Sequence, residues 1–194
     1  MSALDELKRR LRPGQVYRRK DLARWSNAVD RHLRQLVDEG RLEKVSGGVY
    51  MVPRQTRFGA AHATSENLVE TFLGDDRFLI VSTNAYNGLG VGTTQLYNET
   101  VVYNRKRHGR FKLGGRTFDF RLRPSVPLRL TEELLMVDLL HNLDRLAEDR
   151  AEVLPRALER ARTMDPTKLA KALRDYGSAR AKRLLQPLLV APRS

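Results

Sequence analysis

The segment from Arg18 to Pro53 constrains the fold more than any other part of this 194-residue chain. Its first part, Lys20–Trp25, offers apolar side chains at helical spacing, and a second helical run ends at Gly40, a residue type that commonly terminates helices. The Ser26-Asn27 step between them is typical of a tight turn, and Ser26 could cap the second helix. The sequence therefore predicts a helix-turn-helix.

The second predicted helix is amphipathic. Its apolar residues recur three or four positions apart and so share one face: Val29, Leu33, Leu36 and Val37. The opposite face carries side chains of the types that contact bases and phosphates: Asn27, Asp30, Arg31, Arg34 and Asp38. We therefore interpret this segment as a recognition helix, with its polar face turned away from the core.

Two short strands are predicted after Gly40, over residues 42–45 and 49–52, joined by Ser46-Gly47-Gly48. The two glycines can adopt the positive backbone angles of a tight hairpin, which would place Lys44 and Ser46 near its tip. A helix, a turn, a second helix and a hairpin, in this order, predict a winged helix-turn-helix DNA-binding domain over residues 1–57.

The distribution of charge favours the same interpretation. Residues 1–57 contain 14 Lys+Arg and 7 Asp+Glu, so more than half of the formal net charge of +13 lies in the first third of the chain. A charged helix face is usually just solvated, but an excess that coincides with a helix-turn-helix favours contacts with duplex DNA. We expect base contacts from Asn27, Arg31 and Arg34, DNA-backbone contacts from Arg18, Arg19 and Lys20, and wing contacts from Lys44 and Ser46.

Residues 58–194 predict a second, mixed domain, so that the whole chain is α+β. After a connection over residues 55–63, a short helix is expected over 65–73, and strands of a small, mainly antiparallel sheet are expected mainly over 78–122. Gly114-Gly115 is a strong signal for a hairpin. Helices are expected over 131–189, with Thr131 and Asp165 as caps.

No catalytic, cofactor or metal site is expected. The chain has no cysteine, and its four histidines are far apart in sequence, which gives little support to metal binding. Gly88–Gly92 lacks the spacing of a nucleotide-binding loop and is better explained as a turn. The adjacent carboxylates do not form an acid/base pair, and the serines lack the context of a nucleophile. We therefore predict that the protein is not an enzyme.

Two observations leave alternatives open. The basic run Arg105–Arg110, at a predicted hairpin tip, could be a solvated turn, a second phosphate contact beside the winged helix or a docking site for an acidic partner. A basic chain could also be an RNA-binding or ribosome-associated module, or an enzyme acting on a nucleotide or a partner protein. Neither a signal peptide nor a membrane-spanning apolar run is visible, so a cytoplasmic protein without a membrane partner is expected.

Two segments resemble the AbiEi family of antitoxins from type IV toxin-antitoxin systems. The first comprises residues 17–22 (YRRKDL), 29–42 (VDRHLRQLVDEGRL) and 47–50 (GGVY), which look like the family's winged helix. The second follows directly behind the winged helix, as in the family, and comprises residues 81–90 (VSTNAYNGLG), Thr93-Thr94-Gln95, 101–103 (VVY) and 114–118 (GGRTF). Gly90-Val91-Gly92 departs from the Gly-Leu-Ser/Thr form of that segment.

The resemblance implies a repressor that binds promoter repeats of its own operon. It also implies that the protein counteracts a nucleotidyltransferase-type toxin, directly or indirectly, with the antitoxin activity in the C-terminal part. A plain winged-helix regulator without a toxin is the alternative.

Overall fold

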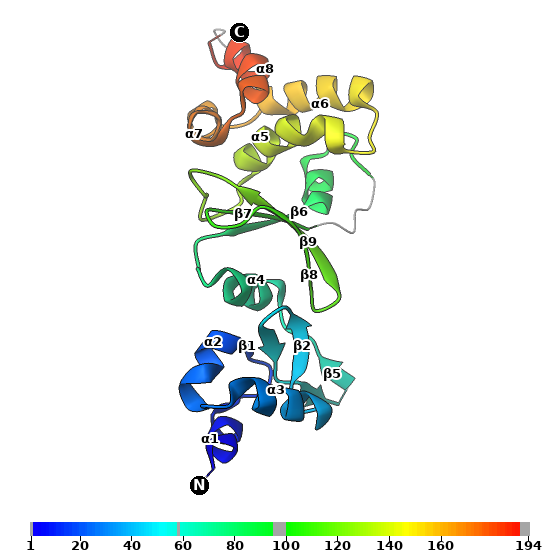
Figure 1. The fold of residues 1–194 in the computed structure, drawn as a ribbon. Helices are drawn as coiled ribbons and strands as arrows, with labels where there is room; N and C mark the ends of the chain where they lie inside the picture. Colours follow the sequence, from blue (N-terminus) through cyan, green and yellow to red (C-terminus); the bar gives the residue numbers. More distant parts are fainter. Residues whose placement is uncertain (1, 58, 95–99, 191–194) are drawn as a thin grey trace. The chain divides into compact units, whose positions relative to one another are not determined.

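A computed structural model describes residues 2–57, 59–94 and 100–190 of the chain (Figure 1). The predicted α+β class is confirmed. The chain forms two compact units, an N-terminal unit of Met1–Phe78 with Lys106–Arg121 and a C-terminal unit of Leu79–Arg105 with Leu122–Ser194. The N-terminal unit therefore includes more of the chain than the winged helix-turn-helix that the sequence predicts over residues 1–57.

Three helices of the N-terminal unit share one apolar core. Helix α1 (Ala3–Arg10) begins in a capping box, in which Ser2 and Asp5 each bond the other's backbone N–H. Helix α2 (Arg19–Leu22) continues into the 3-10 helix η1 (Ala23–Trp25), and α3 (Val29–Asp38) follows. The buried core side chains are Leu7, Leu22, Val29, Leu33, Leu36 and Leu42. Burying each such side chain contributes about 1.5–3 kcal/mol to the free energy of folding. The shared core therefore holds the apolar face of α3 against α1 and α2.

The wing is a three-stranded antiparallel sheet. Strands β1 (Val16–Arg18), β3 (Val49–Met51) and β2 (Glu43–Ser46) pair in that order. Both predicted wing strands are confirmed to within one residue at each end, whereas β1 was not predicted. The turn between β2 and β3 contains Gly48 at φ 71°, a left-handed conformation that favours glycine.

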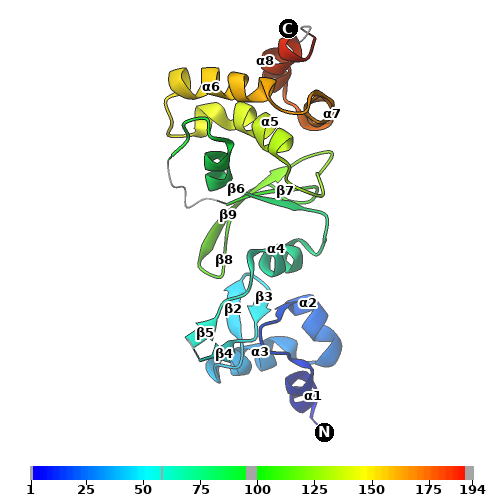
Figure 2. The same cartoon turned by 180° about the vertical axis from the view of Figure 1, so that it is seen from behind.

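The segment after the wing is structured. The predicted connection over residues 55–63 is wrong in part, because it contains an antiparallel pair, β4 (Arg54–Thr56) and β5 (Gly59–Ala61), visible in Figure 2. Helix α4 (Ser65–Leu73) follows as predicted, with the Thr64 hydroxyl accepting the N–H of Asn67 at 3.2 Å.

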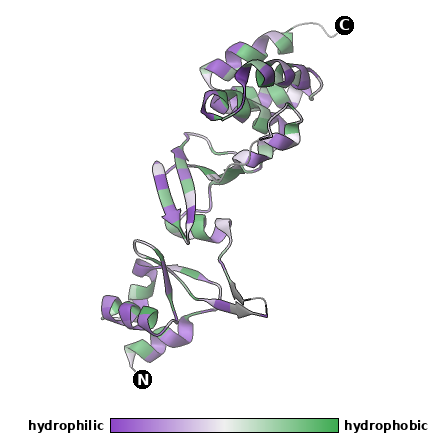
Figure 3. Ribbon diagram, turned by 90° about the vertical axis from the view of Figure 1, so that its right-hand side faces the viewer, coloured by the Kyte–Doolittle hydropathy of each residue, from purple (hydrophilic) through white to green (hydrophobic). Residues whose placement is uncertain are grey.

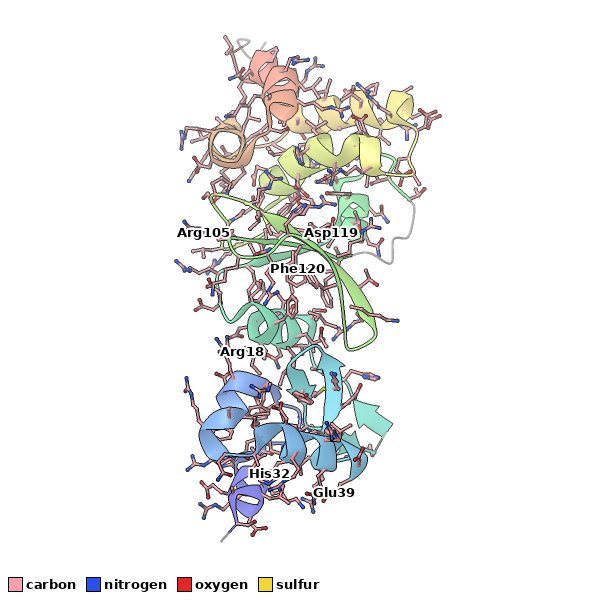
Figure 4. All side chains as sticks on the ribbon, in the orientation of Figure 1. Arg18, His32, Glu39, Arg105, Asp119 and Phe120 are labelled. Atoms are coloured by element: carbon pink, nitrogen blue, oxygen red, sulfur yellow. The ribbon has the colours of Figure 1, made fainter. Side chains whose placement is uncertain are left out.

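A β-hairpin distant in sequence packs on α4. Strands β8 (Gly109–Leu113) and β9 (Arg116–Leu122) pair through the Gly114-Gly115 turn, as predicted. The ring of Phe72 on α4 lies 5.0 Å from the ring centroid of Phe111 and 5.2 Å from that of Phe120, which is labelled in Figure 4. These aromatic contacts explain why residues 106–121 belong to the N-terminal unit.

The C-terminal unit combines a strand pair with a helical array. Strand β6 (Leu79–Ser82) pairs antiparallel with β7 (Thr100–Asn104), and the 3-10 helix η2 (Thr83–Leu89) follows β6. The remaining elements are α5 (Glu132–Asn142), η3 (Leu143–Arg145), α6 (Arg150–Arg162), α7 (Pro166–Tyr176) and α8 (Ala179–Val190). Figure 3 shows both hydrophobic and hydrophilic residues on these helices. Helices α6 and α7 each bury one face, whereas α5 is buried nearly all round, from Leu134 to Leu140.

The predicted caps of two of these helices are confirmed. Thr131 accepts the N–H of Leu134 at 3.2 Å, and Asp165 accepts the N–H groups of Thr167 and Lys168 at 2.9 and 3.1 Å. Helix α5 ends at Asn142, and the 3-10 helix η3 follows it before α6 begins. Within the described part of the chain, we find no helix whose length and apolar character would let it cross a membrane.

Candidate nucleic-acid interface

The start of the candidate recognition helix differs from the prediction. Helix α3 begins at Val29 with Ala28 as its N-cap, and no side chain caps it. Ser26 is therefore not the cap. Its hydroxyl instead accepts the N–H of Ala28 at 3.2 Å and lies 2.7 Å from Nδ1 of His32, a side chain only 6% exposed. His32, labelled in Figure 4, thus belongs to the inner face of α3 and is not available to a phosphate.

Two of the predicted base-reading residues lie on the outer face of α3. Arg31 and Arg34 are both exposed, and neither forms a hydrogen bond or ion pair with the described residues. Their guanidinium groups can therefore donate two parallel hydrogen bonds to a ligand that has two neighbouring acceptors. Asn27 is exposed too, but it lies in the turn before the helix and not on its face, which corrects that part of the prediction.

The three cations before this turn differ in their partners. Nε and Nη2 of Arg18 donate to the Asp21 carboxylate at 2.7 and 3.2 Å. Nε and Nη2 of Arg19 donate to the Asp30 carboxylate at 2.6 and 2.5 Å. Lys20 is exposed and forms no hydrogen bond or ion pair within the described residues. Of the three predicted backbone contacts, Lys20 is thus the one that forms no hydrogen bond or ion pair with the residues that the structure describes.

These ion pairs keep the two aspartates charged. The hydrogen bonds from Arg19 lower the pKa of the Asp30 carboxyl, and those from Arg18 lower the pKa of the Asp21 carboxyl. Asp30 therefore stays ionised at neutral pH in the first turn of α3, where it compensates the charge of Arg19.

The two wing residues also differ in accessibility. Lys44 is exposed on β2 opposite Tyr50, whereas Ser46 is half-buried opposite Val49, with an irregularity in register between them. The carbonyl of Val45, between them, accepts the N–H of Gly114 at 3.2 Å. The β8–β9 turn therefore supports the wing strand, a contact that sequence spacing gives no means of predicting.

The basic run Arg105–Arg110 is not a hairpin tip. It joins β7 to β8, and these strands pair with β6 and β9 respectively. Nζ of Lys106 donates to the carbonyl of Gly74 at 2.8 Å and lies 3.3 Å from a carboxylate oxygen of Asp75. The guanidinium of Arg107 lies 4.5 Å from the ring centroid of Phe72. Both cations are thus held at the C-terminal end of α4.

The glycine-rich segment of the C-terminal unit has the geometry of a turn. Gly90 and Gly92 have φ of 67° and 87°, and a Cβ added at Gly92 would lie 2.6 Å from Nη1 of Arg156. Gln95, part of the segment that resembles AbiEi antitoxins, lies outside the described residues. Among residues 2–57, 59–94 and 100–190, no group of three or more His, Asp or Glu side chains is placed to hold a metal ion.

A buried polar cluster in the C-terminal unit was not predicted. The Asp138 carboxylate, on α5, accepts hydrogen bonds from the hydroxyls of Tyr86, at 2.6 Å, and Tyr103. Nδ2 of Asn142 donates to both hydroxyls, at 3.2 and 3.3 Å. The only sequence signal is a carboxylate amid the apolar residues of α5, since a buried charge requires partners.

The comparisons with known proteins bear on the fold. No protein-family model matches the chain, and no curated protein sequence matches it. The crystal structure of the RV2827C protein from Mycobacterium tuberculosis matches it with a TM-score of 0.58 and 17% sequence identity, over 96% of this chain and 74% of that chain. The arrangement of elements described above is therefore similar to one found in an experimental structure.

Proposed function

We propose that this protein is a sequence-specific DNA-binding transcriptional repressor that reads duplex DNA with the exposed face of α3. The observation that carries the proposal is the pair Arg31 and Arg34, two exposed arginines that form no hydrogen bond or ion pair with other described residues, on a helix whose other face is fixed in the core. Arginine pairs with guanine through two hydrogen bonds in the major groove, and each such pair is worth about 1–3 kcal/mol of discrimination.

Two further features support this proposal. More than half of the net charge of +13 lies in residues 1–57, so the domain that carries α3 attracts a polyanion. The element order of helix, turn, helix and wing is also that of domains which insert their second helix into the major groove.

We further propose that the protein is the antitoxin of a type IV toxin-antitoxin system, as the resemblance to AbiEi antitoxins suggests. In this role it represses its own operon through promoter repeats and counteracts a nucleotidyltransferase-type toxin. The C-terminal unit carries the antitoxin activity, and the protein performs no chemical step itself.

A reporter under the control of the DNA upstream of the protein's own gene tests the repressor role. Co-expression should lower reporter output, and the double variant Arg31→Ala/Arg34→Ala should restore it at equal protein level. Unchanged repression by the double variant would contradict the assignment of α3 as the reading helix. Competition between the promoter duplex and structured RNA for the purified protein should favour the duplex, and a preference for RNA would indicate an RNA-binding module.

Co-expression with the product of the adjacent gene tests the antitoxin role. The expected result is that this product is a nucleotidyltransferase-like protein that arrests growth alone and does not do so in the presence of the full-length chain. Growth arrest that persists with the chain present would contradict the antitoxin role and leave the repressor role intact.

A further inference from the structure

A basic cleft lies within the N-terminal unit, between the wing turn, the start of α2 and the C-terminal end of α4. Four cations line it, Arg18, Arg19, Lys20 and Arg107, together with Gly47 and Gly48 of the wing turn. None of the described residues that line the cleft is acidic. Its volume of about 330 Å³ far exceeds the ~10–15 Å³ that one water molecule needs by the same measure, so a phosphate group with its hydration can enter.

The cations that line the cleft differ in how firmly their side chains are held. Arg18 and Arg19 are oriented by Asp21 and Asp30, and the guanidinium of Arg107 is placed over the ring of Phe72. Lys20, in contrast, is exposed and forms no hydrogen bond or ion pair in the described part of the chain. Because the described lining holds four cations and no carboxylate, the walls of the cleft are positively charged.

The wing turn lets a ligand approach the backbone. Gly47 has no atom within 4 Å of the position of an added Cβ, so open space lies above this part of the turn. Gly48 has a φ of 71° and its carbonyl accepts the N–H of Arg19 at 2.8 Å, which fixes the turn beside the start of α2. Glycines at such a position allow close approach of an anion to the main chain.

The cleft adjoins the candidate recognition helix. Arg19 lines the cleft, and its guanidinium is bonded to Asp30 in the first turn of α3. An anion in the cleft would therefore lie beside the end of α3 that faces DNA bases in helix-turn-helix complexes. The DNA backbone next to the base pairs that contact α3 is such an anion, and it would lie at this position.

We propose that the cleft binds a phosphodiester group of duplex DNA, and that Arg107, from outside the winged helix, is part of the DNA-contacting surface. This inference rests on the proposed DNA-binding function. Arg107 lines the cleft, whereas its neighbour Lys106, whose ammonium group is bound at Gly74 and Asp75, does not. The phosphate-contacting surface would then extend beyond residues 1–57 to the segment that precedes β8.

The salt dependence of DNA binding tests the proposal on the full chain. Each phosphate contact contributes a slope of about 0.9 to the plot of log affinity against log salt concentration. Arg107→Ala and Lys20→Ala should each reduce the slope by about 0.9, which is about a 3.5-fold smaller loss of affinity between 50 and 200 mM salt. Lys112→Ala is the matched control, because Lys112 is an exposed cation on β8, five residues after Arg107, and does not line the cleft.

Lys20→Ala also keeps the test valid if Arg107→Ala disturbs packing on Phe72, because the exposed Lys20 side chain can be removed without opening the core. An unchanged slope in both variants, with specific binding still lost in Arg31→Ala/Arg34→Ala, would overturn the cleft proposal and leave the proposed function standing. A reduced slope in the Lys112→Ala control as well would also overturn it, since the effect would then be one of overall charge.

A titration with inorganic phosphate tests the cleft without DNA. The backbone amide resonances of Gly47 and Gly48 should shift saturably in the wild type and not in Arg107→Ala. If the wild type bound no duplex DNA, the proposed function would fail, and these resonances would decide separately whether the cleft binds phosphate. Absence of any shift in the wild type would overturn the cleft as an anion site.

Discussion

Arg19 and Asp30 form a two-point ion pair that joins the start of α2 to the first turn of α3, with N···O distances of 2.6 and 2.5 Å. The Asp30 carboxylate therefore lies on the face of α3 that also carries Arg31 and Arg34. It also engages the Arg19 guanidinium, which could otherwise contact a phosphate. The Arg19 and Asp30 side chains are 47% and 66% exposed, so water screens their attraction and the pair adds little to the stability of the fold. Its main effects are to orient α3 and to lower the net positive charge of the outer face of α3.

Asp30→Asn should strengthen binding to DNA, because it removes a negative charge from the reading face and frees Arg19 for a phosphate. We expect the salt slope to steepen by about 0.9, the value for one added phosphate contact, with little change in the midpoint of urea unfolding. Fluorescence anisotropy at several salt concentrations measures the slope. Asp38→Asn, which alters an exposed carboxylate at the other end of α3, is the control, and weaker binding by Asp30→Asn would refute the prediction.

Ser26→Ala should destabilise the N-terminal unit. It removes the hydroxyl that lies 2.7 Å from Nδ1 of buried His32 and that accepts the N–H of Ala28. An unsatisfied buried polar group costs about 1–3 kcal/mol, which urea unfolding followed by circular dichroism can measure. Ser125→Ala, at an exposed position, should have no comparable effect. A stability equal to that of the wild type would show that the Ser26 hydroxyl does not hold the start of α3.

Much of the helix-turn-helix and wing could be predicted because their signals are local. The apolar spacing from Val29 to Val37 and the glycines at the wing turn identify α3, β2 and β3. Strand β1 has three residues, too few for a periodic pattern, and it forms only because β3 lies beside it. Serine is a common helix cap, but the Ser26 hydroxyl is bonded to His32, six residues further along the chain, and the sequence alone does not reveal this partner.

The candidate site was less predictable than the fold, because partners distant in sequence decide which charges are available. Arg18, Arg19 and Lys20 are adjacent and look equivalent, yet the ion pairs with the carboxylates at positions 21 and 30 are formed by the two arginines. Arg107 joins the cleft because Phe72, on α4, packs against the β8–β9 hairpin. No spacing rule connects position 72 with position 107.

Gly74→Ala should test the anchoring of Arg18 at the end of α4. Gly74 has a left-handed φ of 59°, and an added Cβ would collide with the Arg18 guanidinium. The strained backbone costs about 1–2 kcal/mol for a residue with a Cβ, and any further loss measures how firmly Asp21 holds the Arg18 guanidinium in place. Thermal unfolding should report the loss. Gly115→Ala, which has left-handed φ but no neighbouring atom within 4 Å, isolates the backbone cost, so equal losses in both variants would argue against the Arg18 contact.

Asp138→Ala should strongly destabilise the C-terminal unit. It leaves the hydroxyls of Tyr86 and Tyr103 without their acceptor in a buried site, and breaking such a cluster costs about 3–5 kcal/mol. Glu159→Ala, at an exposed position on α6, is the control in the same urea unfolding experiment. A loss no larger than that of the control would show that the cluster does not hold α5 to Tyr86 and Tyr103.

The same cluster predicts sensitivity to alkali. Burial raises the pKa of the Tyr86 and Tyr103 hydroxyls above the ordinary value of 10.0, and the charge of Asp138 adds to the effect. Because the unfolded chain loses these protons first, stability should be fully present below about pH 10 and fall above it. Unfolding free energy measured from pH 8 to 11.5 should show this decline. A decline of the same size in Tyr86→Phe/Tyr103→Phe would contradict it.

DNA recognition by α3 is tested most directly by fluorescence anisotropy with a labelled duplex from the region upstream of the protein's own gene, against a scrambled duplex of equal length. The protein should bind the upstream duplex more tightly. Arg31→Ala/Arg34→Ala should lose that preference, about 5- to 150-fold for each bidentate contact removed, while Arg145→Ala/Arg162→Ala, two exposed arginines of the C-terminal unit, should keep it. Equal affinity of the wild type for both duplexes, or an undiminished preference in Arg31→Ala/Arg34→Ala, would contradict DNA recognition by α3.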